Sequence, residues 1–571
     1  MTKLNLIDFF CGAGGFSEGF RQQGFEIVKG YDYWKPAVDT YNYNYGDGKG
    51  VLQNILDFRD SVELIELLPN TDVILGSPPC VSFSSSNNSG KADKSLGVKL
   101  TETFLKIVAV KKFQPNSKLK AWFMENVTNS TTYLAREYNF NDLGLHEWAK
   151  KHRLSPTKIA IKIEGNSVVI NSAEYGSAQI RKRVVTGEII SKGALVVPQK
   201  THGEIKEIFD NDLQPFKKLA FIKDILPKPN SKISDELVSD PIYPNLKIKQ
   251  SDLTDHFYDT GLYSSEWKNS KFLKVNHPYM GTMSFPENED KPSRTITATK
   301  IGTSREALIY RSEYDRTGDG EFRTPTVREA SCIMGFPITY QFIGSEGTKW
   351  RLVGNAVCPS VSRAFAAIVR NELKLSEVPA PCLQKVIDLE KVPNLNSYEE
   401  RSFDVPRKRK SGSRFRRHPF KEGNITVTLS NYDILNNEKE ASKWLTSIQY
   451  GNGEGFPSFN YDEGYFRTIE PIIENLEHGT EFIQIINNGF SEKVATKEHL
   501  QKMYEEQQSI GGYLEPTTLV EFVGELINKL EFKEPVFVQK DIKIFNKDAV
   551  PKKQLFALYA LNKVITIANH N

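Results

Sequence analysis

Residues 4–17 read LNLIDFFCGAGGFS, and this stretch decides the fold. Its apolar start is typical of a buried strand, and the glycines after it predict a turn that leads into a helix. Glycine has no side chain, so a glycine loop lets the backbone pass close to a ligand. The spacing Gly12-x-Gly14-Gly15 lacks the third glycine of the dinucleotide fingerprint, and no Walker lysine follows it. The loop therefore favours a nucleoside or amino-acid ligand over a phosphate.

Two more apolar runs end in side chains that can carry out chemistry. The run VIL at residues 73–75 leads into GSPPC at residues 76–80, where two prolines stiffen the backbone that presents Cys80. The run AWFM at residues 121–124 leads into Glu125. In open parallel sheets, ligands collect at the carboxyl ends of the strands. A glycine loop, a thiol and a carboxylate at three such ends therefore predict a single site.

Each of these features also has an ordinary structural explanation. Cys80 alone could be a small buried cysteine. Glu125-Asn126-Val127 could start a capped helix, and the basic triplet at residues 181–183 could be solvated surface. Their joint occurrence with the glycine loop favours a shared site.

Six short motifs, in this order along the chain, resemble those of the DNA (cytosine-5) methyltransferase family. They are the S-adenosylmethionine loop at residues 8–17, the nucleophile motif Pro78-Pro79-Cys80, the acid motif Glu125-Asn126-Val127, the Gln-x-Arg-x-Arg element at residues 179–183, the motif Arg294-Thr295-Ile296-Thr297 that packs beneath the recognition domain, and the late motif Gly354-Asn355-Ala356-Val357 that returns to the cofactor pocket. The resemblance covers roughly residues 1–375 and says nothing about the rest.

The resemblance implies four catalytic residues, and their chemistry suits methylation of cytosine C5. Addition of the Cys80 thiolate at C6 makes C5 able to attack a methyl sulfonium. Glu125 would hydrogen-bond the pyrimidine N3 and the exocyclic amine, which draws electrons away from C6. Arg181 and Arg183 would hold the flipped nucleotide. After transfer, a base removes the C5 proton and Cys80 departs; the sequence does not identify that base, and a water is enough.

The cofactor that the resemblance implies is S-adenosyl-L-methionine, with no metal. Asp32 follows a second apolar run and suits the ribose hydroxyls, and Tyr33 could lie against the adenine. Asn54-Ile55 stands where the family more often has Asp-Ile; asparagine can still accept from the adenine amine. Cys11 is a milder departure, since small residues such as alanine are usual there. The full predicted cofactor site comprises Phe10, Gly12, Gly14, Gly15, Asp32, Tyr33, Asn54, Ile55, Pro79, Leu100, Asn355 and Val357.

Residues 81–99 are rich in Ser, Asn, Gly and Lys, and nothing in them would pack a core. They predict a flexible surface loop. In the family, the segment after the cysteine is a mobile loop that closes over DNA. Hydroxyls, amides and lysines bind phosphates, and an enzyme that modifies a base inside a duplex must flip that base out.

The composition is that of an ordinary globular protein. The 571 residues predict about two to four domains. The net charge of +3 means that DNA binding would depend on local basic patches. Five scattered cysteines show no disulfide framework or metal spacing, which favours a reducing compartment. We see no signal peptide and no apolar run near the roughly 20 residues of a membrane helix, so we expect a bacterial cytoplasmic or nucleoid location.

The motif positions predict the domain organisation. Residues 1–190 alternate strands and helices, which predicts an α/β, doubly wound, Rossmann-like methyltransferase domain. Two of the expected strands lie at residues 158–163 and 167–170. Residues 191–325 would be a smaller target recognition domain, and residues 326–375, which open with the helical pattern VREASCIM at 327–334, would return to the catalytic domain.

The remainder predicts a linker and a further domain. Residues 376–425 contain several prolines and a basic cluster at 407–417, which could be a solvated tail or could contact the DNA backbone. Residues 426–571 predict a C-terminal α+β domain of unknown function, with a strand at 425–429 and helical apolar patterns at 519–530 and 555–564. The triplets at 531–533 and 541–543 have the Glu/Asp-x-Lys form of nucleases, but that form is common by chance.

Three functions are compatible with the sequence. The leading one is a DNA cytosine-5 methyltransferase that acts on a specific duplex sequence as the modification enzyme of a restriction–modification system, as a monomer beside a cognate restriction endonuclease. A second is a tRNA cytosine methyltransferase, although the Cys-Phe-Thr signature of those relatives is absent. A third is a catalytically silent DNA-binding protein, against which the intact Cys80, Glu125 and paired arginines argue.

Overall fold

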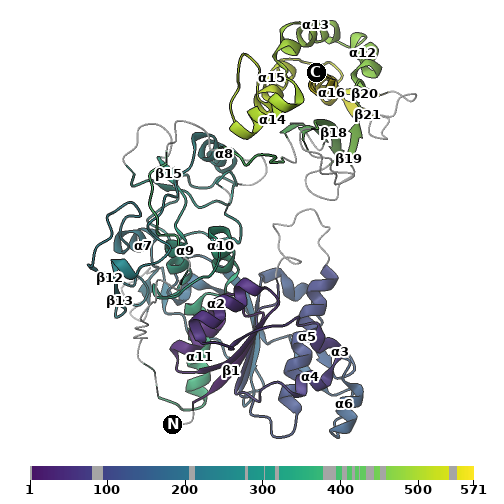
Figure 1. Cartoon of the computed structure of the whole chain (residues 1–571). Coiled ribbons are helices and arrows are strands. Elements are labelled where there is room, and N and C mark those ends of the chain that lie inside the picture. Colours follow the sequence, from purple (N-terminus) through teal and green to yellow (C-terminus); the bar gives the residue numbers. More distant parts are fainter. Residues whose placement is uncertain are drawn as a thin grey trace. The chain divides into compact units, whose positions relative to one another are not determined.

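The computed structural model places most of the chain in two compact units (Figure 1). Among the described residues, Arg401 is the last of the first unit and Lys408 is the first of the second. The structure describes residues 3–570 except 80–93, 205–212, 277–280, 301, 315–320, 377, 379–391, 393, 402–407, 415–417, 423–424, 432–442, 451–457 and 539–548.

A seven-stranded sheet forms the centre of the first unit, in the order β3-β2-β1-β4-β5-β9-β8. Neighbouring strands from β3 to β5 run parallel, whereas β9 is antiparallel to both β5 and β8. The seven strands are β1 (Asn5–Phe9), β2 (Glu26–Asp32), β3 (Gly50–Leu52), β4 (Val73–Gly76), β5 (Ala121–Asn126), β8 (Ser167–Asn171) and β9 (Lys182–Ile189).

Alternate residues of the central strands enter two different cores, because successive side chains of a strand point to opposite faces. Leu6 and Phe123 pack with the helices on one face, and Ile7 and Trp122 pack with those on the other. The first face carries α1 (Gly15–Gln22) and α11 (Pro359–Glu372), and the second carries α5 (Lys94–Phe113) (Figure 1). The sheet is therefore doubly wound and Rossmann-like, as predicted. Both faces are covered, so β4 and the start of β5 are continuous apolar runs, whereas β2, β8 and β9 also contain charged or polar residues.

The chain folds away from β1 in both directions, with β2 on one side and β4 on the other. Such a reversal of strand order opens a crevice at the carboxyl ends of the two strands. The glycine loop follows β1 and residues 77–79 follow β4, so both lie at this point of the sheet.

Two elements differ from the sequence prediction. The helix α5 begins at Lys94, so the last part of the predicted loop at residues 81–99 is helical; residues 80–93, Cys80 included, lie outside the described residues. The predicted strand at 158–163 forms as β7 (Ile159–Lys162), but it pairs with β6 (Glu137–Asn139) in a separate sheet. The other helices of this part of the unit are α2 (Lys35–Tyr45), α3 (Asp57–Asp60), α4 (Val62–Glu66) and α6 (His146–Lys151).

The predicted recognition region, 191–325, has short paired strands and two helices in its described residues. The pairs are β10 (His202–Gly203) with β11 (Gln214–Pro215), β12 (Leu237–Ser239) with β13 (Lys247–Lys249), and β14 (Tyr310–Arg311) with β15 (Phe322–Arg323). The helices are α7 (Leu219–Ile225) and α8 (Ser264–Val275), after which α9 (Val327–Met334) and α10 (Glu346–Asn355) lead to α11. The predicted helix at 327–334 is confirmed, and Thr326 and Glu329 form a capping box at its start.

One described stretch, Glu346–Glu372, has the length and hydropathy of a membrane-spanning helix. It comprises α10 and α11, and 72% of its apolar window is buried inside the protein. The side chains of α11 pack on the central sheet, which accounts for their apolar character.

The second unit combines a four-stranded antiparallel sheet with five α-helices in its described residues. The sheet order is β16 (His418–Glu422), β17 (Ile425–Ser430), β18 (Leu445–Tyr450) and β19 (Ser458–Tyr461), and a separate hairpin joins β20 (Val536–Val538) to β21 (Ala549–Pro551). The helices are α12 (Phe466–Glu474), α13 (Gly479–Ile485), α14 (Lys497–Glu506), α15 (Pro516–Asn528) and α16 (Lys552–His570).

The helix α16 is the centre of the second unit. Leu555, Leu558, Leu561 and Val564 are buried as the apolar pattern predicts, but so are most of the residues between them. A helix that is apolar on all sides lies inside a core. This core also contains the predicted helix α15 and the predicted strand β17.

The boundaries of the second unit differ from the predicted linker at 376–425. Residues 394–401 pack within the first unit, and β16 already belongs to the sheet of the second. In the basic cluster, Lys408 pairs with Glu506, and the Arg409 guanidinium lies 4.1 Å from the centre of the Tyr504 ring. The described part of the cluster is thus attached to α14 by its own charges, which favours a structural role for these two side chains.

Candidate functional site

A cavity of about 1040 Å³, counting space open to solvent, lies at the carboxyl ends of β1, β2, β4 and β5. It brings together ten of the predicted site residues. These are Phe10, Gly12, Asp32, Tyr33, Pro79, Glu125, Arg181, Arg183, Asn355 and Val357. Segments that are more than 300 residues apart in sequence therefore line one pocket: the loop after β1 and the residues at the end of α10.

Glycine is required at each of the three positions of the loop for a different structural reason. Gly12 has a φ of +52° and no close neighbour at its Cβ position, so its backbone faces open space in the pocket. A Cβ on Gly14, which has a φ of +86°, would lie 2.7 Å from the Tyr45 and Tyr340 side chains. A Cβ on Gly15 would lie 2.1 Å from the Val357 carbonyl oxygen. Only Gly12 lines the pocket among them; Gly14 and Gly15 allow α1 to pack closely.

Asp32 ends β2 and points its carboxylate toward the glycine loop. Oδ2 accepts a hydrogen bond of 2.9 Å from the Gly12 amide, and Oδ1 accepts one of 2.8 Å from the Trp34 amide. Burial raises the pKa of Asp32, and these backbone donors and the nearby Arg351 guanidinium counteract the rise. The carboxylate is thus fixed at the edge of the cavity, where it can accept hydrogen bonds from a ligand.

Asp8 is a pocket residue that the predicted site omitted. Its side chain is completely buried, and Oδ2 accepts a hydrogen bond of 2.7 Å from the Ser17 hydroxyl. Oδ1 has no hydrogen-bond partner among the described residues. Burial raises the pKa of Asp8 to about 7. A buried acceptor without a partner fits a polar ligand or water in the pocket.

Glu125 is held between two polar side chains from neighbouring strands. It lies within β5, which extends to Asn126 and not only to the predicted Met124. The Ser77 hydroxyl, just after β4, donates to Oε2 at 2.8 Å, and Arg183 Nε in β9 lies 3.2 Å from Oε1. The Glu125 side chain is only 8% exposed. A carboxylate fixed by a hydroxyl and a guanidinium is oriented for hydrogen bonding to a ligand.

Arg181 and Arg183 line the same pocket but make different contacts. Arg181 Nη1 donates to the Ile296 carbonyl at 3.1 Å, and Nη2 donates to the Gly354 carbonyl at 3.0 Å and to the Ala356 carbonyl at 3.2 Å. Arg181 therefore joins the motifs at 294–297 and 354–357 to β9. Both Nη atoms of Arg181 donate to backbone carbonyls, and the expectation that both arginines hold a nucleotide stays a prediction.

Several predicted residues do not line the cavity. Ile55 is in the core on the far face of the sheet, and Asn54 accepts from the Leu56 amide at 3.1 Å through its side chain. Leu100 lies within α5. Gly14 and Gly15 have the packing roles given above, and Cys80 is outside the described residues.

Besides Asp8, the cavity includes several side chains that the predicted site omitted, among them Ser77, Trp34 and Arg351. Arg351 lies 4.6 Å from the centre of the Trp34 ring, so α10 is connected to the start of α2 beside Asp32. Trp34 follows Tyr33 directly, Ser77 lies two residues before Pro79, and Arg351 lies four residues before Asn355. This proximity in the sequence is the signal that could have identified them.

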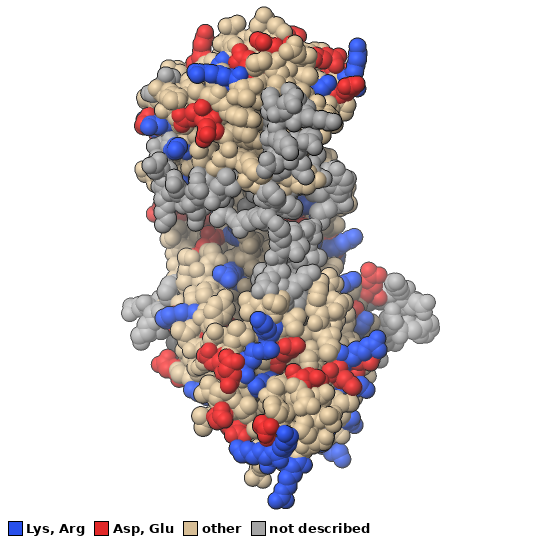
Figure 2. Space-filling model, turned by 90° about the vertical axis from the view of Figure 1, so that its right-hand side faces the viewer, with Lys and Arg blue, Asp and Glu red and all other residues tan. Residues whose placement is uncertain are grey.

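Charged side chains of both signs occur on the surface of the protein (Figure 2). Basic and acidic side chains are interspersed on the face shown in Figure 2, in keeping with the net charge of +3. Among the described residues, no group of three His, Cys, Asp or Glu side chains could hold a metal ion.

Comparisons with known proteins identify the family. The family model for C-5 cytosine-specific DNA methylase matches residues 4–371. Type II methyltransferase M.HgiDI of Herpetosiphon aurantiacus is 28% identical over 364 residues, covering 62% of this chain and 90% of the relative. Type II methyltransferase M1.HphI of Haemophilus parahaemolyticus is 26% identical over 372 residues, covering 64% and 87% respectively.

Among solved structures, Entamoeba histolytica methyltransferase EhMeth aligns over 65% of this chain and 99% of its own, at 15% identity and a TM-score of 0.39. The assignment rests on the family model, which matches well over half of the chain and contains all six motifs. The chain belongs to the C-5 cytosine-specific DNA methylase family and is a DNA (cytosine-5)-methyltransferase.

Proposed function

We propose that this enzyme transfers the methyl group of S-adenosyl-L-methionine to C5 of a flipped cytosine in a specific duplex sequence, through a covalent bond between Cys80 and cytosine C6. The observation that carries the proposal is the position of Glu125. Its carboxylate is held by Ser77, three residues before Cys80, and by Arg183, in the cavity that the Gly12 loop and Asp32 also line.

The chemistry of the pocket fits S-adenosyl-L-methionine. Phe10, Tyr33 and Trp34 supply aromatic surface for an adenine, and the Asp32 carboxylate supplies an acceptor for ribose hydroxyls. The open space above Gly12 admits a ligand close to the backbone. When bound, this cofactor supplies an electrophilic methyl group on a sulfonium.

The protein's own groups account for activation of the base. The electron pair of the Cys80 thiolate forms the bond to C6, and the electrons of the C5–C6 double bond become available at C5. Glu125, when it carries a proton, donates to N3 and accepts from the exocyclic amine, and so favours the addition. Once C5 carries the methyl group, loss of the C5 proton to a base restores the double bond and expels the Cys80 thiolate, which regenerates the enzyme.

The two arginines have separate roles in this proposal. Arg183 orients the Glu125 carboxylate through their 3.2 Å contact. Arg183 would also contact the base or its phosphate. Arg181 is a positioning residue, because its guanidinium connects three backbone carbonyls from two distant motifs. We propose this division in place of the expectation that both arginines hold the nucleotide.

We further propose a biological setting from the printed names of the relatives. Both are Type II methyltransferases, which supports a modification enzyme of a bacterial restriction–modification system. The enzyme would act as a monomer on duplex DNA in the bacterial cytoplasm or nucleoid, beside a cognate restriction endonuclease. The described residues 531–533 form a loop in which the Lys533 amide donates to Glu477, and residues 541–543 lie outside the description, so the structure adds no support for a fused nuclease.

Methylation of DNA by the purified full-length protein tests the proposal. We expect tritium from labelled S-adenosyl-L-methionine to appear in 5-methylcytosine of unmethylated duplex DNA, and bisulfite sequencing to show one target sequence. Cys80→Ala should bind the cofactor but transfer no label. Label on tRNA alone, or label on DNA with Cys80→Ala equal to wild type, would contradict the proposal.

A further inference from the structure

A segment beyond the family match, residues 394–401, is bound along the recognition region of the first unit. We call it the strap. Its central contact is Asn396: Oδ1 accepts from the His256 amide at 2.9 Å and from the Phe257 amide at 3.1 Å, and Nδ2 donates to the Leu253 carbonyl at 2.6 Å. One side chain thus satisfies three backbone groups of another segment, a specific attachment that a loose linker would lack.

Both ends of the strap bind the same partner, residues 253–261, which we call the central segment. Asn394 Oδ1 accepts from the Asp255 amide at 3.3 Å. At the other end, the Arg401 amide donates to Asp259 Oδ2 at 3.2 Å, and Arg401 Nη2 donates to the Asp259 carbonyl at 2.6 Å. The strap therefore follows the central segment over its whole length.

The central segment is connected to the pocket through α10. Asp255, which has a φ of +58°, accepts at Oδ1 from the Leu395 amide of the strap at 3.1 Å and from Lys349 Nζ at 2.6 Å. The Lys349 and Asp255 side chains are both wholly buried. Lys349 lies in α10, and Arg351, two residues later, lines the cavity. One carboxylate oxygen thus joins the strap to the helix that bears part of the cofactor pocket.

A second connection leads from the central segment to the glycine loop. Arg328 Nε donates to the Thr254 carbonyl at 3.1 Å, and Arg328 Nη1 donates to the Tyr340 carbonyl at 2.7 Å. The Tyr340 hydroxyl in turn donates to the Ala13 carbonyl, between Gly12 and Gly14. The helix α10 and the glycine loop, which both contribute to the pocket, are therefore linked to the central segment that the strap holds.

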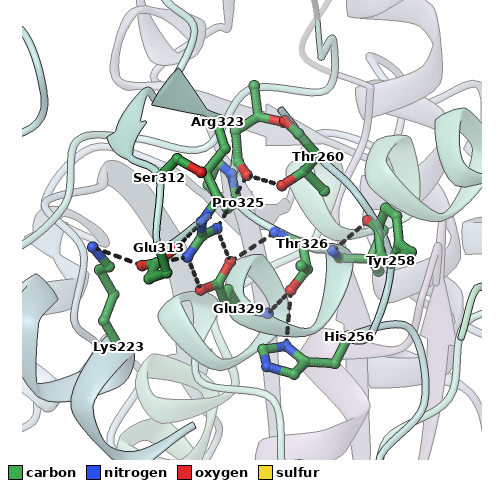
Figure 3. A network of polar contacts seen from close by, with 12 residues as sticks. Lys223, His256, Tyr258, Thr260, Ser312, Glu313, Arg323, Pro325, Thr326 and Glu329 are labelled. Carbon is green, nitrogen blue, oxygen red and sulfur yellow. Dashed lines mark hydrogen bonds and ion pairs between the residues drawn. The ribbon is translucent and has the colours of Figure 1, made fainter. Parts of the chain in front are cut away.

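A buried ionic network fixes the central segment on its other side (Figure 3). His256 Nδ1 is 3.1 Å from the Thr326 hydroxyl, which caps α9 together with Glu329. Arg323 binds Glu329 through two contacts of 2.7 and 2.8 Å and also binds Glu313. The Arg323 guanidinium holds the pKa of Glu329 down at about 2. Displacement of the central segment would disturb these buried charges. The position of the central segment therefore determines the position of the residues that it contacts.

We propose that the strap is a positioning element of the methyltransferase, with Asn396 as its principal residue, and that it sets the cofactor pocket through the central segment. The inference rests on the proposed cofactor but not on the proposed reaction. It extends the functional methyltransferase unit from the end of the family match at residue 371 to Arg401.

Binding of S-adenosyl-L-methionine to full-length variants, measured by calorimetry without DNA, tests the inference. We expect Asn396→Ala to raise the Kd roughly tenfold, because it removes three hydrogen bonds that fix the central segment. Asn396→Asp keeps the two acceptor contacts but places an oxygen against the Leu253 carbonyl, so its Kd should lie between those of Asn396→Ala and the wild type. The control is Glu399→Gln, an exposed strap residue, whose Kd should match that of the wild type.

The outcomes separate positioning from mere stability. A merely structural role would lower the Tm of Asn396→Ala while the Kd, measured well below that Tm, stayed unchanged, and this result would overturn the inference. If Asn396→Ala fails to fold, Arg401→Ala with Arg401→Lys as its conservative partner decides in the same way. Tight cofactor binding by the wild type without cytosine methylation would refute the proposed function and leave this inference standing.

Discussion

The interior of each unit is stabilised by a different kind of interaction. In the first unit, charged side chains such as Asp255, Arg323, Arg328, Glu329 and Lys349 are buried among the segments that surround the pocket. In the described part of the second unit, the core is an apolar cluster around α16, and few charged side chains are buried. Apolar packing gives stability with little positional preference, whereas buried ion pairs require one geometry. The comparison suggests that the first unit uses buried charge where distant segments must meet in register.

The largest effect is expected from Arg323→Met, which leaves Glu329 and Glu313 buried without their guanidinium. Loss of one partner of a buried ion pair costs about 3–5 kcal/mol, and urea denaturation should show this loss for the first unit. The lowered pKa of Glu329 stabilises the fold above its ordinary value of 4.5 and ceases to do so as the pH falls toward 2. The difference between variant and wild type should therefore shrink over that range.

The matched control for this change is Arg311→Met. Arg311 is in the same hairpin but exposed, so its replacement should change the free energy of unfolding by about 0.5 kcal/mol or less. Equal effects of the two substitutions would show that buried charge has no special role here.

A cavity in the apolar core should affect the second unit alone. Leu558→Ala removes a completely buried side chain of α16, which costs about 2–5 kcal/mol. Calorimetry can assign the transitions, because S-adenosyl-L-methionine raises the Tm of the unit that binds it. We expect Leu558→Ala to lower the Tm of the transition that the cofactor does not shift. Val538→Ala, at a position that is 64% exposed, is the control and should leave both transitions in place.

Asp8→Asn should remove the pH dependence that Asp8 contributes to the free energy of unfolding. The pKa of Asp8 is raised from 3.8 to about 7, so its contribution is fully present below pH 3.8 and is lost as the pH rises through 7. A shift of that size corresponds to up to about 4 kcal/mol. Asparagine can still accept from Ser17 and carries no charge, so the variant should gain stability over wild type between pH 5 and pH 8. Parallel Tm profiles of the two proteins across this range would contradict the account.

A smaller effect is expected for Ser77→Ala, which removes one hydrogen bond to Glu125. A hydrogen bond to a charged group contributes about 1.5–3 kcal/mol, so kcat should fall roughly tenfold or more. The free energy of unfolding should fall by no more than the contribution of that hydrogen bond, so kcat is compared well below the Tm of the variant. Ser155→Ala, at an exposed site, is the control. Unchanged kcat in Ser77→Ala would remove Ser77 from the account of the pocket.

Part of the central sheet could be predicted from sequence, because β1, β4 and β5 are buried on both faces and are therefore largely apolar runs. Residues 73–75 and 121–124 are examples. The strands β3 and β9, which lack such a run, were not predicted. The motif order also predicted that Glu125, Arg183 and Asp32 share a pocket, since strand order places their segments at one edge. The ends of the strands were predicted less accurately than their positions. The strand β5 continues through Glu125, beyond the end of its apolar run, because its backbone still pairs with β9.

What the sequence could not predict depends on contacts between distant segments. Arg181 and Arg183 look alike in the sequence, and only the carbonyls of residues 296, 354 and 356 distinguish them. The strap was interpreted as linker because Asn396 attaches through amide hydrogen bonds and not through an apolar pattern. Asp8 was overlooked because it lies inside the apolar run of β1.

The most direct test of the central claim is covalent trapping on duplex DNA that contains 5-fluorocytosine at the target site. Fluorine cannot leave as a proton does, so the bond between Cys80 and C6 should persist after the methyl group has been transferred. We predict a complex that resists denaturing detergent, forms only with S-adenosyl-L-methionine present, and yields a modified peptide containing Cys80. A trapped complex with Cys80→Ala, or attachment at another residue, would contradict the account.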